Sequence, residues 1–131
     1  MIEEKTLEIV ESPSDNGTRL GTIVSEFRSG RNVHEILALL DAGNSQLISI
    51  GAWILSELPF ESYDFPEFEN RLRKLVGHDA PGVRFSTFSA LFPALKPQEA
   101  ATEELLNKLR TDADKGVRMA AEAAAAQLLG V

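Results

Sequence analysis

The sequence predicts an all-α protein, a short α-solenoid of about four antiparallel helix pairs. The main observation is a repeated passage. Residues 82–95 read GVRFSTFSALFPAL, and residues 116–129 read GVRMAAEAAAAQLL, 34 positions later. A more diverged copy, QLISIGAWILSEL, occupies residues 46–58. Self-similarity with a period of about 20 to 50 residues is typical of stacked helix pairs. Such stacks present a long surface that usually binds another macromolecule.

The length and composition are those of a single soluble domain, residues 1–131. The mass is 14.3 kDa, with 44% hydrophobic and 25% charged residues, values typical of globular proteins. Cysteine is absent, which excludes disulfides and thiolate metal sites and fits a reducing cytosol. The acidic N-terminus MIEEKTLEIVESP lacks the pattern of a signal peptide, and no apolar run is long enough for a bilayer. We therefore expect a cytoplasmic protein with no membrane partner.

The charge balance favours a basic protein partner over nucleic acid. Lys and Arg total 13 against 20 Asp and Glu, which gives a net charge of −7 and a pI near 4.8. Nucleic-acid-binding proteins usually carry a basic patch, and none is visible here. An acidic surface attracts basic proteins and speeds their association. The alternative is that the charge serves only solubility.

Residues 1–30 are expected to form an irregular unit that caps the stack, because terminal repeats are commonly atypical. Residues 16–29 contain IVSEF, which resembles ILSEL later in the chain, and we interpret them as the second helix of this unit. Residues 1–12 fit either a helix or a short strand in which Leu7 and Ile9 alternate with polar residues.

The rest of the chain divides into three repeats of two helices each: residues 31–60, 61–96 and 97–131. In the first of these, Asn32 and Glu35 form a capping box that begins one helix. The second helix covers about residues 45–58 and ends before Pro59.

The second of these repeats, residues 61–96, follows the same plan. Asp64 and Glu67 form a capping box at the start of its first helix. Its second helix is predicted from Val83 to about Leu95. The last repeat is expected to hold two helices, over about residues 98–110 and 115–129.

The last repeat resembles the HEAT family of helix-pair repeats. Its sequence DADKGVRMAAEAAAAQLL has acidic loop residues, then Val-Arg, then small residues and a leucine. Asp112, Asp114 and Arg118 stand at the positions of that pattern, and Asp79 and Arg84 are a weaker version of it. The resemblance implies that the arginine and the loop aspartates bond along the stack. It indicates architecture and not function.

A narrower resemblance suggests a function. Residues 39–60, LLDAGNSQLISIGAWILSELPF, resemble small bacterial HEAT-like proteins that are associated with polymorphic toxin systems. This resemblance implies a compact acidic immunity protein that binds a cognate toxin and blocks it.

Candidate contact residues follow from projecting the second helices at 100° per residue. Trp53 falls on the polar side of its helix, and Phe85, Phe92 and Met119 stand at or near corresponding positions of later repeats. Together they would form an apolar strip along the stack, a typical interface anchor. The alternative is that stacking buries the aromatic side chains between repeats.

The connector of residues 57–69, ELPFESYDFPEFE, is a second candidate because it combines acidic and aromatic residues without Lys or Arg. Glu57, Glu61 and Tyr63 are the predicted contacts with a basic protein. The other acidic residues have local explanations. Asp64 caps a helix, and two glutamates precede arginines by four positions: Glu67 before Arg71, and Glu69 before Arg73.

Catalytic patterns are weak. His34 and His78 are the two histidines, and neither has a second histidine or a carboxylate four residues later, so we expect no metal site and no cofactor. No glycine-rich phosphate-binding loop is present. We therefore expect a non-catalytic protein-binding module and a monomer, most specifically an immunity protein that occludes a basic toxin domain. Two alternatives remain: a scaffold or regulatory adaptor of HEAT-like type, and a HEAT-like enzyme of nucleobase-excision or lyase type.

Overall fold

The computed structural model describes residues 2–11 and 16–130, and every regular element in these ranges is helical. This confirms the predicted all-α class. The described α-helices are α1 (Ile2–Glu11), α2 (Asn16–Arg28), α3 (Ile36–Leu40), α4 (Ser45–Glu57), α5 (Phe65–Leu75), α6 (Pro81–Leu91), α7 (Ala100–Leu109) and α8 (Lys115–Leu129). Short 3-10 helices extend or connect them: η2 (Val33–Glu35), η3 (Phe60–Ser62) and η4 (Phe92–Ala94).

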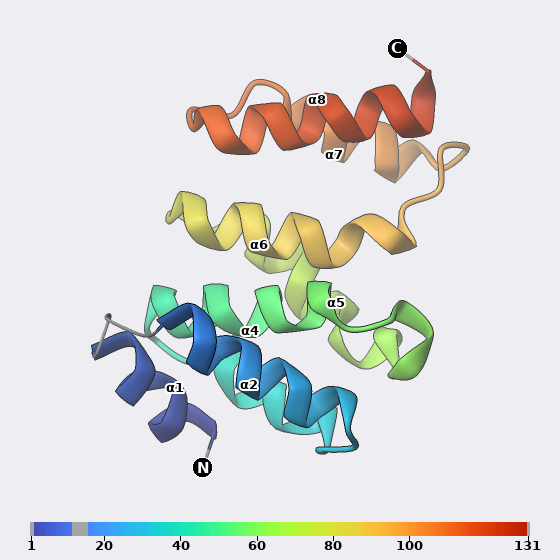
Figure 1. Cartoon of the computed structure of the whole chain (residues 1–131). Coiled ribbons are helices and arrows are strands. Elements are labelled where there is room, and N and C mark those ends of the chain that lie inside the picture. Colours follow the sequence, from blue (N-terminus) through green and yellow to red (C-terminus); the bar gives the residue numbers. More distant parts are fainter. Residues whose placement is uncertain (1, 12–15, 131) are drawn as a thin grey trace.

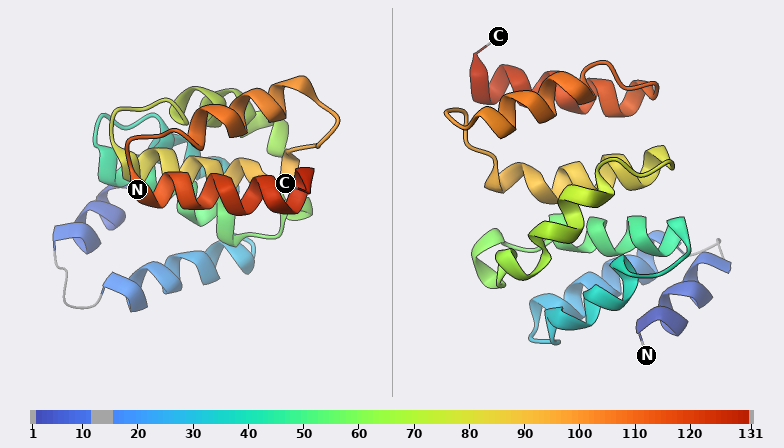
Figure 2. Two further views of the ribbon diagram at one scale, coloured as in Figure 1. Left: turned by 90° about the horizontal axis from the view of Figure 1, so that it is seen from above. Right: turned by 180° about the vertical axis from the view of Figure 1, so that it is seen from behind.

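Helices α4, α6 and α8 lie side by side along one face of the molecule (Figure 1). Helix α4 packs along α6, and α6 packs along α8. Another helix lies behind each of them, with α3 on α4, α5 on α6 and α7 on α8 (Figure 2). Helix α1 contacts α2, α3 and α4 at the N-terminal end. Packing partners are thus close in chain order.

The N-terminal segment is helical, so the strand alternative for it is wrong. Ile2 and Thr6 are buried one helical turn apart, which is the spacing of a helix face and not the alternation of a strand. Positions 1 and 12 of that segment lie outside the described residues. Helix α2 agrees with the prediction for residues 16–29 to within one residue.

The predicted end of the helix that begins near Val83 is wrong. Helix α6 ends at Leu91, and residues 92–94 form the 3-10 helix η4. Pro93 accounts for the difference, because proline has no N–H to donate to the carbonyl four residues earlier. The tighter turn redirects the chain toward α7.

The capping box of the first full repeat is half-formed. Asn32 accepts a hydrogen bond from the backbone N–H of His34 at 3.0 Å, as an N-cap should. The Glu35 carboxylate instead accepts from the Arg31 guanidinium, at 3.0 and 3.1 Å. Asn44 caps α4 and fixes its start at the predicted position.

The core follows the predicted face of the central helix α4. That face is buried, as expected from its spacing: Leu47, Gly51, Ile54, Leu55 and Leu58. Gly51 allows the close approach of α3, because a Cβ atom built there would lie 2.8 Å from the Leu39 Cβ. Buried apolar residues of α5, α6, α7 and α8 belong to the same hydrophobic core.

Replacing Gly51 by alanine is expected to lower the free energy of unfolding by about 1–2 kcal/mol. The alanine gains helix propensity, but its Cβ meets the Leu39 Cβ, an atom fixed by the α3 backbone. Gly21→Ala in α2 is the matched control, since a Cβ atom added there would have no neighbouring atom within 4 Å. It should stabilise the protein by roughly 0.5–1 kcal/mol. Urea unfolding measures both, and equal stability of the two variants would contradict the close contact between α3 and α4.

Candidate protein-binding surface

Helices α6 and α8 each present one large apolar side chain to solvent. Phe85 is 45% exposed and Met119 is 58% exposed. Helix α6 buries Val83, Phe88 and Leu91 on its inner side, which places Phe85 on the outer side. The alternative that stacking buries Phe85 between repeats is therefore wrong. Exposed apolar side chains of this size are typical of interaction surfaces when they adjoin a groove.

Such a groove of about 280 Å³ lies between the same two helices. Its lining residues come from the α6–η4 segment and from α8: Phe88, Ser89, Phe92, Ala120, Ala123, Ala124 and Gln127. Phe88 and Phe92 meet edge to face with their ring centroids 6.4 Å apart. The alanines of α8 carry only a methyl group, so they do not fill the space in front of these rings. The groove is therefore apolar with two polar side chains at its margin.

Trp53 is half-buried and packs against the core, and it does not line the groove. Phe92 is also half-buried, but it does line the groove. The contact of α4 with α6 is partly polar. The Ser49 hydroxyl donates to the Gly82 carbonyl at 3.1 Å and lies 2.9 Å from the Ser86 hydroxyl. Phe92 therefore lines the groove together with alanines of α8. The other residues of the predicted strip, Trp53, Phe85 and Met119, do not line it.

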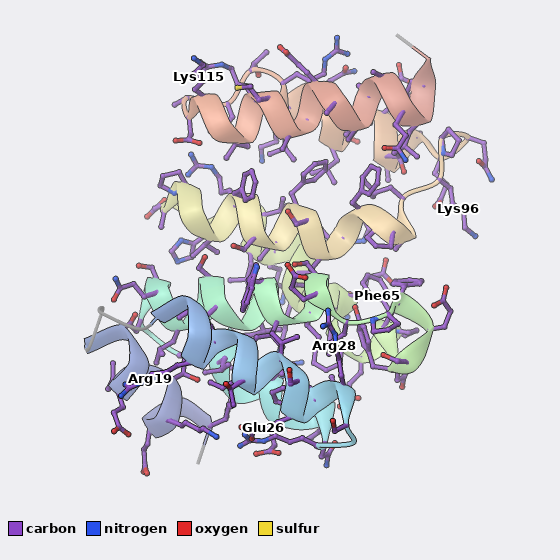
Figure 3. The ribbon with its side chains drawn as sticks, in the orientation of Figure 1. Arg19, Glu26, Arg28, Phe65, Lys96 and Lys115 are labelled. Atoms are coloured by element: carbon purple, nitrogen blue, oxygen red, sulfur yellow. The ribbon has the colours of Figure 1, made fainter. Side chains whose placement is uncertain are left out.

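The acidic contacts predicted on the connector lie in different places. Glu57 is exposed, and its carboxylate lies 3.9 Å from the guanidinium of Arg28. Figure 3 labels Arg28 at the end of α2. Glu61 is exposed and lines a cavity of about 550 Å³. Tyr63 is half-buried between Phe60 and Phe68, with ring centroids 6.4 and 5.7 Å away. Its burial raises the pKa of the Tyr63 hydroxyl to about 12, so the group stays protonated at neutral pH.

The local explanations for the other connector acids are only partly correct. Glu69 pairs with Arg73 at 2.8 Å, as predicted. Glu67 instead contacts His34 of the preceding repeat. Arg71 binds Asp41 at 2.8 Å, across the turn between α3 and α4. Glu67 and Arg71 therefore bind residues of the preceding repeat and not each other.

The second capping box is not formed. Asp64 occupies the N-cap position of α5, but its carboxylate makes no capping hydrogen bond. Proline in the first turn of that helix removes one of the N–H groups that a cap would satisfy.

Arginines at the start of α6 and α8 organise the loops before these helices. Arg84 donates to both carboxylate oxygens of Asp112 at 2.8 and 2.9 Å, and to the carbonyls of His78 and Asp79. Within the described residues, the hydrogen bonds of Arg118 go to two loop carbonyls, those of Asp112 and Ala113. Hydrogen bonding by Arg84 holds the pKa of the Asp112 carboxyl below its ordinary value. Arg84 thus links α6 to the loop before α8, whereas the bonds of Arg118 stay within its own loop.

The described residues offer no arrangement for catalysis by metal. Residues 2–11 and 16–130 contain no group of three or more His, Asp or Glu side chains placed to hold an ion. The His78 ring accepts a hydrogen bond from the Ala80 N–H, a local turn contact. Within the same ranges, no helix combines the length and hydropathy needed to span a bilayer.

Periodicity does not predict the residues that shape the groove and the larger cavity. It assigns no contact role to Phe88, to the alanines of α8, or to Lys96 and Glu99. The pattern that indicates the groove is the pairing of a Phe-rich helix with an Ala-rich one at corresponding repeat positions. No family model, no curated protein and no solved structure matches this chain.

Proposed function

We propose that this chain is a non-catalytic protein-binding module, built as a short HEAT-like α-solenoid. The antiparallel pairs would be α3 with α4, α5 with α6, and α7 with α8. The packing within each pair, and the packing of α6 between α4 and α8, support this arrangement. The link from Arg84 to the loop of the next pair is of the kind that the HEAT resemblance implies.

The observation that carries the proposal is the apolar surface of α6 and α8. Ser89 lies one helical turn after Phe85, and Ala123 lies one turn after Met119. Both helices run in the same direction (Figure 1). The exposed Phe85 and Met119 therefore flank one end of the groove that Ser89 and Ala123 line. A partner helix or loop that fills the groove would bury both side chains at once.

The partner is proposed to be a basic protein. The net charge of −7 steers a basic protein toward the surface and repels nucleic acid. In its most specific form the partner is a toxin domain, and the module is an immunity protein that inhibits it by occupying its active or entry site. The resemblance of residues 39–60 to immunity proteins supports this form.

Phe85→Ala is expected to weaken partner binding about thirtyfold, because an exposed aromatic anchor contributes roughly 2 kcal/mol at an interface. Leu7→Ala is the matched control, since Leu7 is also a large exposed apolar residue, 36% exposed, but lies on α1. Wild-type and variant proteins serve as baits in the lysate of the source organism, with mass spectrometry and then calorimetry on the recovered protein. Equal recovery by all three baits would contradict the proposed surface.

The identity of the recovered partner decides between an immunity protein and a protein-binding module of another kind. A basic toxin, released by about 0.5 M salt because of charge screening and inhibited at equal molar ratio, supports the immunity function. A multi-subunit housekeeping complex that is retained through Phe85 would contradict the immunity function and support an adaptor.

A further inference from the structure

The connectors that follow α4 and α6 lie at one end of the molecule and line the cavity of about 550 Å³, which is open to solvent. Figure 3 shows Phe65 at the start of α5 and Lys96 on the chain that leaves η4. The residues of the two connectors that line the cavity are Phe60, Glu61, Tyr63, Asp64, Phe65, Pro66, Glu69, Arg73, Pro93, Ala94, Lys96 and Glu99. The volume falls in the range of about 300–1,000 Å³ that is usual for ligand sites.

The cavity carries an excess of negative charge. Glu69 and Arg73 neutralise each other in an ion pair of 2.8 Å. Among the described residues, Glu61, Asp64 and Glu99 line the cavity without an ion pair. Lys96 is the one lining cation outside the Glu69 pair in this part of the described chain, so carboxylates outnumber the cations that oppose them.

Two of these carboxylates lie at the N-cap positions of helices. Asp64 is the N-cap residue of α5 and Glu99 is the N-cap residue of α7, and neither side chain makes a capping hydrogen bond. Both are exposed, and their oxygens are available to a ligand. The partial charges at the starts of α5 and α7 oppose a cation, but each amounts to only about half a unit, and the three carboxylates of Glu61, Asp64 and Glu99 exceed these charges and that of Lys96 combined.

The apolar wall of the cavity includes three aromatic rings, those of Phe60, Tyr63 and Phe65. Phe60 lies 4.9 Å from Phe65 and 6.4 Å from Tyr63, measured between ring centroids. A planar guanidinium stacks on such rings and donates to carboxylates in pairs, whereas an ammonium group does neither as well. We infer that this cavity receives an arginine side chain of the basic partner, an inference that rests on the proposed function.

The test uses N-acetyl-arginine N-methylamide as the probe, titrated into the ¹⁵N-labelled protein at low salt and followed by NMR. The neutral citrulline analogue is its control, because it has the same shape without the charge. Saturable shifts of the amides of residues 60–65 and 94–99 with the arginine probe alone are expected. Equal shifts with citrulline, or shifts spread evenly over the acidic helix α1, would overturn the inference.

Matched variants locate the charge that binds the probe. Asp64→Asn with Glu99→Gln should weaken probe binding about fivefold. Glu103→Gln with Glu104→Gln removes the same charge from exposed positions of α7 that do not line the cavity, and should leave binding unchanged. Lys96→Gln should strengthen it. Equal weakening by both double variants would overturn the inference in favour of general charge attraction.

The NMR titration tests the cavity separately from the bait experiment on Phe85, so the two proposals can fail independently. If the probe fails to bind while the baits recover a basic partner through Phe85, the arginine cavity is wrong and the proposed function stands. If the probe binds in the cavity and no bait recovers a partner, the cavity's preference for arginine is supported and the proposed partner is overturned.

Discussion

Replacing Arg84 by alanine is expected to lower the free energy of unfolding by about 3 kcal/mol. The side chains of Arg84 and Asp112 are only 15% and 10% exposed. Arg84 also satisfies two carbonyls of the loop before α6, at 2.8 and 2.9 Å. Its removal leaves a mostly buried carboxylate without a counter-ion and two carbonyls without a donor. Urea unfolding monitored by circular dichroism measures the loss.

Arg118→Ala is the matched control for this prediction. Arg118 stands at the corresponding position of α8 and donates to two loop carbonyls, but it makes no ion pair in the described residues. Its removal should cost about 1 kcal/mol. If the two variants are equally destabilised, the ion pair with Asp112 adds nothing beyond the loop hydrogen bonds.

The difference between wild type and Arg84→Ala should shrink in acid. Hydrogen bonds from Arg84 lower the pKa of Asp112 in the folded protein below the unfolded value, which is about 3.9. The stability from this pair is therefore fully present above that value and is lost as the pH falls through the folded pKa. Unfolding curves at successive pH values, from neutral down to about 2.5, would reveal this loss of stability. A constant difference at every pH would instead assign the effect of Arg84 to packing.

The all-α class was predictable because helical spacing is a local property of the chain. The copies at Gly82 and Gly116 placed two helices, and the buried face of α4 followed from its spacing. Errors arose where a side chain has two competing partners. Glu67 was expected to cap its own helix, but His34, from the preceding repeat, contacts it instead. Such competition depends on how repeats pack, which periodicity does not reveal.

The candidate surface was only partly predictable. Exposure of Phe85 and Met119 follows from their position opposite the buried face. The groove is the space left between Phe92 and Ala124 when α6 and α8 pack. Its volume depends on the tertiary packing of the two helices, which the sequence pattern does not give. Likewise the larger cavity combines two connectors that are distant in sequence. The repeat plan does indicate, however, that connectors after the second helices lie at the same end.

Replacing Ala123 by tryptophan is expected to weaken partner binding at least about a hundredfold, because the new side chain occupies the groove that the partner would fill. Ala123 is exposed and lines the groove in front of Phe92. An indole at this position can cover that ring within the same molecule. Little stability should be lost, since no atom of the core has to move. Calorimetric titration of the recovered partner measures the effect.

Ala126→Trp provides the matched control. Ala126 is also exposed on α8 and does not line the groove. The two variants share size, hydrophobicity and helix propensity. If Ala126→Trp blocks binding as strongly as Ala123→Trp, the contact lies elsewhere on α8 and the groove is not the binding element. If Ala123→Trp binds normally while Phe85→Ala does not, the partner contacts the exposed phenylalanine without entering the groove. Loss with Ala123→Trp alone would place the partner between α6 and α8, where the phenylalanine rings face the alanine methyl groups.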